Sequence, residues 1–263
     1  IWAFKISGPS GEEAVRGVAV DPSGNVYVTG NFNSTSDFDP SAATFNLSTS
    51  GNSDAFLAKY SSAGNFIWAV KIGGGADESS NKMFADANGI YITGSYDSSS
   101  PTFYSYSSPV TKTPFFADAQ VNMFGAKYNS AGVAQWVISG GSNKDDYGLQ
   151  VIADATTIYF IGHYFHEISF KSATGVSSAT MGDEQHDKAN TFILSATQAG
   201  ALGWQTNITT STSNKHVSGW GIAQDASNLY VTGQSDGDLN FKYPSPTLTQ
   251  TLSSGNDLFL AKL

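Results

Sequence analysis

The stretch Asp21-Pro-Ser-Gly-Asn-Val-Tyr-Val-Thr-Gly30 decides the fold, because its pattern occurs four times in the chain. Each copy begins with a turn, in which Asp can accept hydrogen bonds from its own backbone and Gly or Asn tolerates a positive φ. Each copy then continues as a strand rich in β-branched and aromatic residues. The other copies are Asp86-Ala-Asn-Gly-Ile-Tyr-Ile-Thr-Gly94, Asp154-Ala-Thr-Thr-Ile-Tyr-Phe-Ile-Gly162 and Asp225-Ala-Ser-Asn-Leu-Tyr-Val-Thr-Gly233.

Two further features recur with the same period and define the repeats. Tryptophans are spaced by 66, 68 and 68 residues, and a segment of the type Asp54-Ala-Phe-Leu-Ala-Lys-Tyr60 precedes each next tryptophan. A fixed internal period of this kind indicates a repeat architecture. We assign a single domain over 1–263, with repeats of approximately 1–66, 67–134, 135–202 and 203–263. The spaced tryptophans are Trp2, Trp68, Trp136 and Trp204.

The second strand of each repeat is apolar on both faces. Val26, Tyr27 and Val28 are consecutive, whereas a strand with one wet face should alternate apolar and polar residues. Helical periodicity is absent throughout. Small antiparallel sheets covered on both sides and repeated around an axis form a β-propeller. The sequence therefore predicts an all-β propeller of four blades, with about 66 residues per blade.

The two ends of the chain predict how the ring closes. Residues 1–7 supply only a Trp strand, and residues 218–263 supply the first three strands of a blade. We expect the N-terminal strand to complete the last blade, which leaves no open edge in the ring. The alternative is an open segment of a longer array, because both ends also coincide with a hairpin.

Composition narrows the classes of function. The net charge of −9 is spread along the chain and includes no basic stripe, which argues against nucleic acid and against anionic membrane surfaces. No apolar run approaches the length of a membrane span, so we expect no membrane insertion. The absence of cysteine excludes disulfides and thiolate ligands. No signal peptide is visible, and we expect a mature form or a fragment.

The recurring segments together resemble the bacterial β-propeller repeat family known as SBBP repeats. The resemblance is carried by the turn and strand quoted first, by 54–60, by Ser62-Ala-Gly-Asn-Phe-Ile-Trp-Ala69 and by Asp37-Phe-Asp-Pro40. It implies a secreted or cell-surface protein, notably of Bacteroidetes, with an adhesion, scaffold or binding role. It brings no catalytic motif. Repeat 3 departs from the pattern, because it lacks the turn glycine and has Ser195 where the other repeats have lysine.

The repeated tryptophans and lysines have structural interpretations. Tryptophans at the same place in every repeat are expected to pack between blades rather than to form a binding surface. Lys59, Lys127 and Lys262 follow an apolar strand, and we expect them to extend their ammonium groups to the solvent at a blade edge.

The insertion of repeat 2 is the candidate ligand-binding site. Aromatic rings on a proline-rich loop suit stacking on a sugar or contact with a protein. They suit equally a satellite core that folds the insertion onto its blade, and both interpretations stay open. The residues are Phe103, Tyr104, Tyr106, Phe115 and Phe116.

The insertion of repeat 3 is the candidate metal site. It holds three of the four histidines, and imidazole nitrogen with carboxylate oxygen suits zinc or another transition metal. The i, i+3 spacing of its first two histidines places them on opposite faces of a regular strand, and a solvated polar loop is the alternative. The candidate ligands are His163, His166, His186 and Asp187.

Two aspartate pairs are candidate calcium ligands. Asp37 and Asp39 in repeat 1, like Asp236 and Asp238 in repeat 4, follow the glycine of the second strand. Close aspartates with backbone carbonyls can hold Ca²⁺, but they also form turns.

These features favour a non-catalytic propeller that is secreted or lies at the cell surface. Its variable insertions would serve adhesion or the assembly of a surface structure, through protein or glycan partners or through self-assembly. A lectin-like module is one alternative. A metal-dependent enzyme, using repeat 3 or carboxylates at the ring mouth, is another.

Overall fold

A computed structural model gives the fold of the chain. It describes residues 1–8, 12–97, 99–108, 110–114, 116, 120–182, 188–210, 215–242, 248–250 and 256–263. Within these ranges the chain forms strands β1 to β20 and no helix. The strands are arranged in four antiparallel sheets, which confirms the predicted all-β propeller class with its repeated small sheets.

Each sheet is one blade, and short strands from the following repeat are added to blades 1, 2 and 3. Blade 1 contains β1 (Ala14–Val20), β2 (Val26–Asp37), β3 (Asn46–Tyr60) and β4 (Phe66–Gly73). Blade 2 contains β5 (Glu78–Asp86), β6 (Gly89–Tyr96), β8 (Asn122–Tyr128) and β9 (Ala134–Gly141). Blade 3 contains β10 (Tyr147–Ala153), β11 (Thr157–Phe165), β14 (Ala189–Thr197) and β15 (Leu202–Thr210). Blade 4 contains β16 (Val217–Gln224), β17 (Leu229–Ser235) and β20 (Asp257–Lys262).

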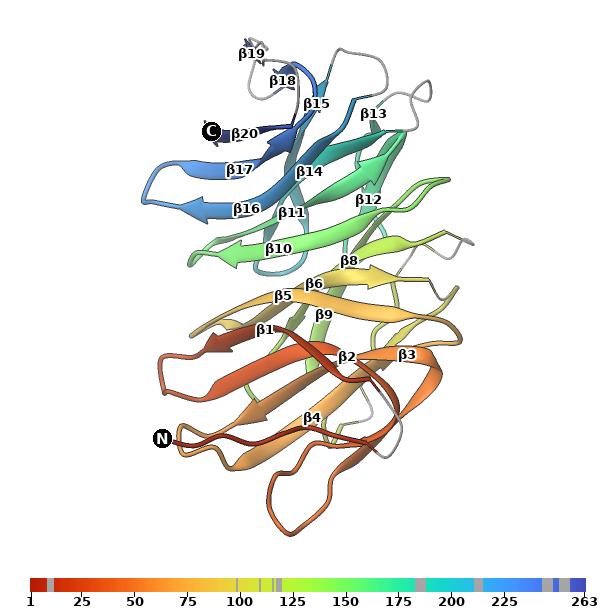
Figure 1. The fold of residues 1–263 in the computed structure, drawn as a ribbon, viewed down its shortest axis with the longest axis vertical. Coiled ribbons are helices and arrows are strands. Elements are labelled where there is room, and N and C mark those ends of the chain that lie inside the picture. Colours follow the sequence, from red (N-terminus) through yellow and green to blue (C-terminus); the bar gives the residue numbers. More distant parts are fainter. Residues whose placement is uncertain are drawn as a thin grey trace.

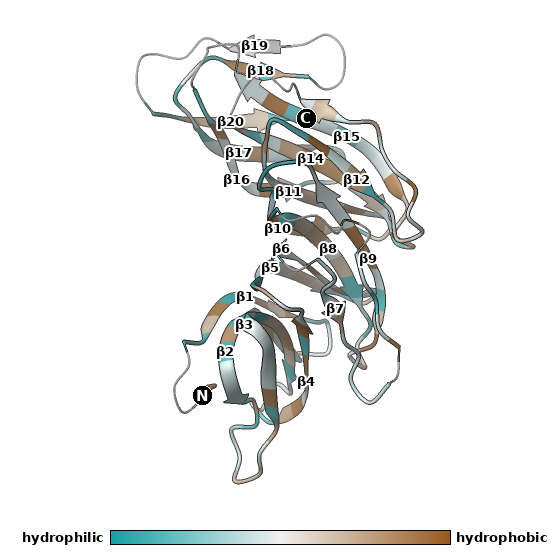
Figure 2. Cartoon of the chain, turned by 90° about the vertical axis from the view of Figure 1, so that its right-hand side faces the viewer, coloured by the Kyte–Doolittle hydropathy of each residue, from teal (hydrophilic) through white to brown (hydrophobic). Residues whose placement is uncertain are grey.

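The four blades stack face to face in a curved row (Figures 1 and 2). The N-terminus lies at one end of the row and the C-terminus at the other (Figure 1). The first strands of successive blades, β1, β5, β10 and β16, are neighbours along one side of the row. Residues at the ends of these strands therefore come together from different repeats.

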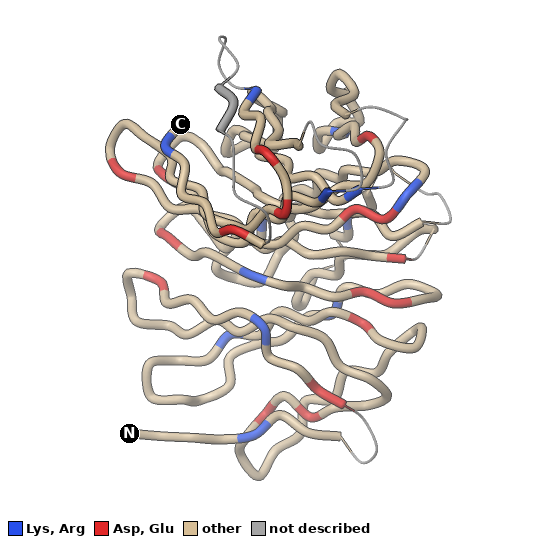
Figure 3. Tube along the Cα trace, turned by 45° about the horizontal axis from the view of Figure 1, so that its top comes forward, with Lys and Arg blue, Asp and Glu red and all other residues tan. Residues whose placement is uncertain are grey.

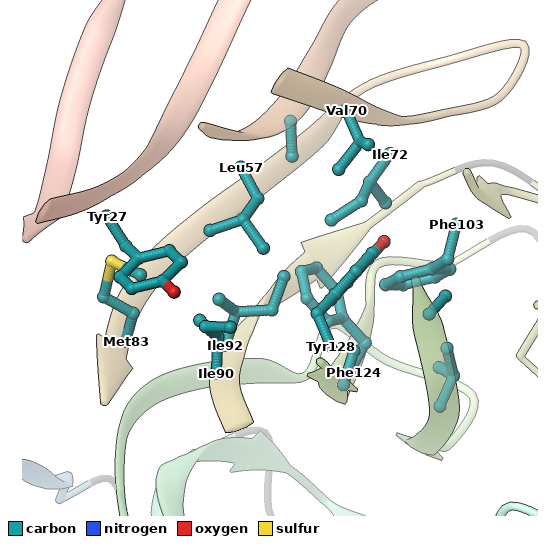
Figure 4. Packing of buried hydrophobic residues seen from close by; sticks show 14 of the residues in the cluster. Tyr27, Leu57, Val70, Ile72, Met83, Ile90, Ile92, Phe103, Phe124 and Tyr128 are labelled. Carbon is teal, nitrogen blue, oxygen red and sulfur yellow. The ribbon is translucent and has the colours of Figure 1, made fainter. Parts of the chain in front are cut away.

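Apolar side chains fill the space between neighbouring blades. Leu57 and Val70 of blade 1 meet Ile90 and Ile92 of blade 2 in one continuous cluster (Figure 4). Equivalent clusters join blade 2 to blade 3 and blade 3 to blade 4. Strands apolar on both faces are thus buried on both sides wherever a blade has two neighbours, as their sequence predicts.

The repeated tryptophan joins its own blade to the turn of the next one. The Trp68 indole donates a hydrogen bond from Nε1 to the backbone carbonyl of Ser130, at 3.2 Å. The Trp136 indole donates in the same way to the carbonyl of Gln198, at 3.0 Å. Both rings are almost fully buried, and the predicted packing of tryptophans between blades is confirmed for these two.

A glycine in the receiving turn makes this contact sterically feasible. Gly132 has a φ of +79°, and a Cβ atom there would lie 3.0 Å from the Trp68 ring. Gly200 meets Trp136 in the same way, and Gly64 meets Trp2. The glycine of the Ser-Ala-Gly turn is therefore fixed both by backbone conformation and by the tryptophan that covers it.

In repeats 1 and 2 the repeated lysine serves the same junction, which corrects the expectation that it extends into solvent. Lys262 in repeat 4 is exposed, as expected. Lys59 is 8% exposed, and its Nζ donates to the Ser130 carbonyl that also accepts the Trp68 bond, at 3.0 Å. The ammonium lies 5.2 Å from the centroid of the Tyr27 ring. Burial lowers the pKa of Lys59. The aromatic face and the carbonyl compensate in part for lost hydration.

The same arrangement of lysine, tyrosine and turn carbonyl recurs at the second junction. Lys127 lies 5.4 Å from the Tyr91 ring centroid and donates to the side-chain oxygen of Gln198, at 2.8 Å. In repeat 3, Ser195 takes the place of the lysine and donates instead to the Trp204 carbonyl. The departure of repeat 3 from the sequence pattern is therefore local to this junction.

The insertions between the second and third strands of a repeat extend the preceding blade. β7 (Thr102–Phe103) pairs with β4, β12 (Glu167–Lys171) pairs with β9, and β18 (Leu239–Phe241) pairs with β15. β13 (Met181–Gly182) and β19 (Leu248–Gln250) continue two of these sheets. The insertions of repeats 2, 3 and 4 thus cross to the preceding blade and tie the two blades together.

The prediction that residues 1–7 complete the last blade is wrong in this structure. The segment lies against blade 1, where Trp2 Nε1 donates to the Ser62 carbonyl at 3.0 Å and Phe4 packs on Tyr60 with ring centroids 4.6 Å apart. Ser7 forms a bridge to Asp37. The tryptophan binds the turn that follows it in the chain, and this local contact holds the segment at the opposite end of the row from β20.

We expect the buried junction tryptophan to be indispensable for stability. Replacing Trp68 by Ala removes a core aromatic and its hydrogen bond, which should lower the free energy of unfolding by about 3–5 kcal/mol. Trp220 is 54% exposed, so Trp220→Ala should change it by less than about 1 kcal/mol. Urea unfolding of the two variants measures the difference, and similar losses for both would contradict the role of the junction.

Candidate functional site

A hollow of about 420 Å³ lies where the insertion of repeat 2 crosses onto blade 1. Its floor is the outer strand β4 at 69–71, and one wall is the start of β3. The other wall is the segment 104–107 from the insertion. We call this hollow the aromatic pocket, and its side chains include Phe45, Leu47, Lys71, Tyr104 and Tyr106.

Backbone and charge interactions fix the walls of the aromatic pocket. The backbone N–H of Tyr104 donates to the Lys71 carbonyl at 3.2 Å. The Lys71 ammonium lies 5.5 Å from the Tyr104 ring centroid and 3.3 Å from a carboxylate oxygen of Asp54. The ammonium also donates to the Ser50 hydroxyl, at 2.6 Å. One face of Tyr104 is therefore held by a cation, and the ring is 38% exposed.

The predicted aromatic set divides between core and surface. Phe103 is fully buried and packs edge-on against Phe124, with ring centroids 5.0 Å apart. Tyr106 is partly buried and stacks on Trp68, at 6.4 Å. Phe116 lies beneath the ammonium of Lys171, and Phe115 lies outside the described residues. Phe103 belongs to the core cluster between blades 1 and 2, whereas Tyr104 and Tyr106 line the aromatic pocket.

The chemistry of the aromatic pocket suits a ligand with an apolar face and polar edges. Tyrosine rings offer a flat surface that loses little conformational entropy on binding. The Lys71 ammonium beside them is held by the Ser48 carbonyl, the Ser50 hydroxyl and Asp54, and the phenolic hydroxyls of the two tyrosines can form hydrogen bonds with a ligand. Sugar rings and peptide side chains both present this combination of surfaces.

A second hollow, of about 480 Å³, lies at the mouth of the row between blades 1, 2 and 3. Sequence analysis considered carboxylates at this mouth but did not identify the residues. The hollow, called the polar cleft below, is lined by amide, hydroxyl and carboxylate groups from several strands. The lining includes Arg16, Asn31, Asn33, Asp77, Ser79, Asp97 and Tyr147.

Part of the polar cleft is internally hydrogen-bonded and part offers free acceptors. Arg16 Nε donates to the side-chain oxygen of Asn31 at 2.9 Å, and Asn31 donates in turn to Ser53. By contrast, Asn33 Oδ1 and Ser79 Oγ are buried and have no hydrogen-bond partner. Buried polar atoms without a partner are costly, so these two positions suit the polar groups of a ligand.

The polar cleft could not be identified from one repeat alone, because its residues come from three. Most lie a few positions before or after the recurring strand pattern. Asn31 and Asn33 follow Gly30, and Ser95 and Asp97 follow Gly94. The recurrence of polar residues directly after this glycine is the sequence feature that predicts a polar surface at the mouth of the row.

The histidines of repeat 3 lie apart from both hollows. The imidazole of His163, on β11, packs edge-on against Trp220 with centroids 5.2 Å apart. His166 has a φ of +64° at the turn that leads into β12. His186 and Asp187 lie outside the described residues. Among the residues that the structure describes, no three His, Asp or Glu side chains are grouped to hold a metal. The transition-metal site stays a prediction.

The aspartates considered for calcium act in turns where the structure describes their contacts. Asp37 Oδ1 accepts hydrogen bonds from the backbone N–H groups of Asp39 and Phe45, at 3.0 and 2.9 Å. Asp39 Oδ1 accepts from Ser41. Asp236 accepts from the backbone of His216. The bonds to Asp39 and Ser41 match the turn interpretation for repeat 1, whereas the bond to Asp236 joins residues that are distant in the chain. Calcium binding stays a prediction.

The charge distribution agrees with the composition. Acidic and basic residues are scattered along the trace without a continuous basic stripe (Figure 3). No helix among the described residues is long and apolar enough to cross a membrane.

Fold and repeat pattern define a β-propeller protein, and comparison with known families agrees. Residues 6–39 match the model of the SBBP β-propeller repeat family. This range covers β1, β2 and the start of the first insertion, so the resemblance to SBBP repeat proteins rests on the repeat in which the pattern is sharpest.

One curated relative is a larger protein. The chain is 29% identical over 181 residues to an uncharacterized WD repeat-containing protein of Acanthamoeba polyphaga mimivirus. The match covers 65% of this chain and 13% of the viral protein. The chain therefore spans a small part of that relative. A bacterial source stays a prediction.

We predict that His163 makes stability depend on acid pH. Burial lowers its pKa to about 4 in the fold, from an ordinary value of 6.5. Between these values the unfolded chain binds a proton that the folded chain does not. This contribution to stability is therefore complete above about pH 6.5 and falls by at most about 1.4 kcal/mol per pH unit towards pH 4.

Urea unfolding at several pH values checks this prediction against the variant His163→Gln, which cannot titrate. The variant should lose stability less steeply than the parent between pH 6.5 and 4. Equal slopes for the two proteins would contradict the assignment.

Proposed function

We propose that the chain is a non-catalytic binding propeller of a secreted or cell-surface protein, and that it acts in adhesion by binding a glycan in the aromatic pocket. One observation carries the proposal. Tyr104 is exposed at a hollow that also contains Tyr106 and the ammonium of Lys71. An exposed aromatic ring whose phenolic hydroxyl can also form hydrogen bonds is a surface on which proteins stack sugar rings.

The resemblance to SBBP repeats supports a binding role, because the family brings no catalytic motif to these residues. The Lys71 ammonium at the pocket is paired with Asp54, so the pocket fits a neutral ligand better than a strongly charged one. Binding at the edge of blade 1 leaves the buried junctions of the row intact.

The proposal is tested by glycan-array screening of the purified chain, followed by titration of any glycan that binds. Tyr104→Ser should weaken binding about tenfold or more, which corresponds to about 1.4 kcal/mol. Its melting temperature should stay within a few degrees, because the ring is 38% exposed.

Val110→Ser is the matched control. Val110 lies in the same insertion and is similarly exposed, but it does not line the aromatic pocket. Full binding by Tyr104→Ser, or an absence of binding to every glycan, would refute the proposal.

The polar cleft favours a second candidate function, the binding of a protein loop rich in hydrogen-bonding groups. The support is the pair of unpartnered atoms on Asn33 and Ser79. Removing both side chains by Asn33→Ala and Ser79→Ala should leave the stability of the free protein unchanged or slightly higher, because neither group gains a protein partner.

The same double variant should bind a protein partner more weakly. Cross-linking of surface proteins to the parent and to the double variant, with calorimetric titration of the captured partner, measures this loss. A partner that binds both equally, or a double variant that unfolds readily, would exclude the polar cleft as the site.

A further inference from the structure

The polar cleft between blades 1, 2 and 3 carries an excess of negative charge. Among the residues that the structure describes, its lining includes three carboxylates and one guanidinium. These groups belong to Asp77, Glu78, Asp97 and Arg16. A fourth carboxylate, that of Asp145, lies beside the cleft, because it accepts a hydrogen bond from the hydroxyl of the lining residue Tyr147 at 3.4 Å. A surface with this balance of charge attracts a cation more strongly than an anion.

The guanidinium of the cleft is held by an amide group rather than by a carboxylate. A bulge in β1, where the register shifts between Val15 and Gly17, places Arg16 at the cleft. Its Nε donates to the side-chain oxygen of Asn31 at 2.9 Å. The carboxylates of Asp77 and Asp97 are exposed at the rim and stay accessible to a ligand.

Neutral oxygen atoms stand between these carboxylates in the wall of the cleft. Ser79 and Ser95 are directly opposite each other on β5 and β6, so their side chains lie on the same face of the sheet. Ser95 is 9% exposed and lines the cleft, and among the described residues its hydroxyl has no hydrogen-bond partner. Ser79 Oγ and Asn33 Oδ1 are buried without a partner. Several acceptors at one place suit a group with several N–H donors.

The fold holds its own ammonium groups on pairs of aspartate and tyrosine. The Tyr27 hydroxyl donates to Asp21 at 3.0 Å, and the Lys59 ammonium lies 5.2 Å from the centroid of the Tyr27 ring. An aromatic face and a nearby carboxylate both favour a cation at this position. The same arrangement occurs in two further sets, Asp86 with Tyr91 and Lys127, and Asp225 with Tyr230 and Lys262.

Tyr147 and Asp145 form a fourth pair of this kind, and this pair lies at the polar cleft. Burial raises the pKa of Tyr147, and the carboxylates of Asp145, Asp146 and Asp97 raise it further, so their negative field reaches the ring. Among the described residues, the ammonium groups that lie over aromatic rings are all at other rings. The fourth pair therefore has room for a cation from another molecule.

We propose that the polar cleft binds a basic side chain, lysine or arginine, that is carried by a loop of a partner protein. This assignment rests on the second candidate function, protein binding at the polar cleft, and adds the chemical group that is recognised. The hollow of about 480 Å³ is large enough for a long side chain together with the backbone that carries it. Among the described residues, no three carboxylates or histidines are grouped as metal ligands, so an organic cation fits the cleft better than a metal ion.

Each part of the cleft has a role in holding such a side chain. The carboxylates at the rim attract the charge and steer the approach of the loop. The oxygens of Asn33, Ser79 and Ser95 accept N–H groups, and the Tyr147 ring packs against the aliphatic stem or the charged head. The acceptors that lack a partner in the free protein are then hydrogen-bonded in the complex.

Selection from a library of short disulfide-closed loops displayed on phage, with the parent protein as the target, tests the proposal. Loops that bind the parent but not the double variant Asn33→Ala, Ser79→Ala are the cleft-binding loops. These loops should share a lysine or arginine at one position. Cleft-binding loops without a basic residue would overturn the proposal and leave the second candidate function standing. A library without any cleft-binding loop would overturn both.

A synthetic copy of the best cleft-binding loop measures the contribution of the charge. Replacing its basic residue by norleucine keeps an aliphatic chain but removes the charge, and should weaken binding about tenfold or more in calorimetric titration. Asp97→Asn should weaken binding of the basic loop about fivefold and leave binding of the norleucine loop unchanged, because only the interaction between the two charges is lost. Its melting temperature should stay within a few degrees, because Asp97 is exposed.

Asp225→Asn is the matched control for Asp97→Asn. It removes the same charge from an exposed turn between β16 and β17, outside the polar cleft, and should leave the affinity for the basic loop unchanged. Raising the salt concentration from about 0.05 M to about 0.5 M should weaken binding of the basic loop severalfold and that of the norleucine loop hardly at all. Equal affinity for the two loops, or an equal loss in Asp225→Asn and Asp97→Asn, would overturn the proposal.

Discussion

The backbone carbonyl of one turn in each repeat is the point on which the row of blades depends. At both internal junctions with a lysine, a buried indole and a buried ammonium from one blade reach the turn of the next. An indole N–H and an ammonium cannot be buried cheaply without acceptors. The junction therefore has one geometry in which both donors are satisfied, and apolar packing alone would not specify that geometry.

This constraint explains which residues of the repeat are fixed and which can vary. The turn glycine is required because the tryptophan ring covers it, and the tyrosine is required because it supports the lysine. The tip of an insertion takes no part in these junction contacts, although its first residues pair with the preceding blade. The aromatic pocket lies where the insertion of repeat 2 crosses onto β4. The insertion can change in sequence there, because β4 beneath it is held in blade 1 by its own pairing.

Features that lie within one repeat could be predicted from the sequence, whereas features formed by contacts between two repeats could not. The four strand patterns and the buried tryptophans could be predicted because they recur at a fixed period. The burial of Lys59 could not, because its acceptor lies on Ser130 in the next repeat. The polar cleft was missed for the same reason. Phe103 and Tyr104 are neighbours of the same residue class, and only the pairing of β7 with β4 distinguishes core from surface.

The misplacement of residues 1–7 has a related cause, and it clarifies what a blade is. Sequence pattern predicts an outer strand here, whereas the structure forms only the bridge from Ser7 to Asp37. An outer strand has two neighbours. Its backbone pairs with the third strand of its own blade, while its tryptophan binds the turn of the blade that follows. The structure satisfies the second contact, which is close in sequence and brings a hydrogen bond and ring packing together. The first contact requires a distant sheet edge. The nearest such edge would be that of β20, which lies at the other end of the row, so the local contact decides where the segment lies.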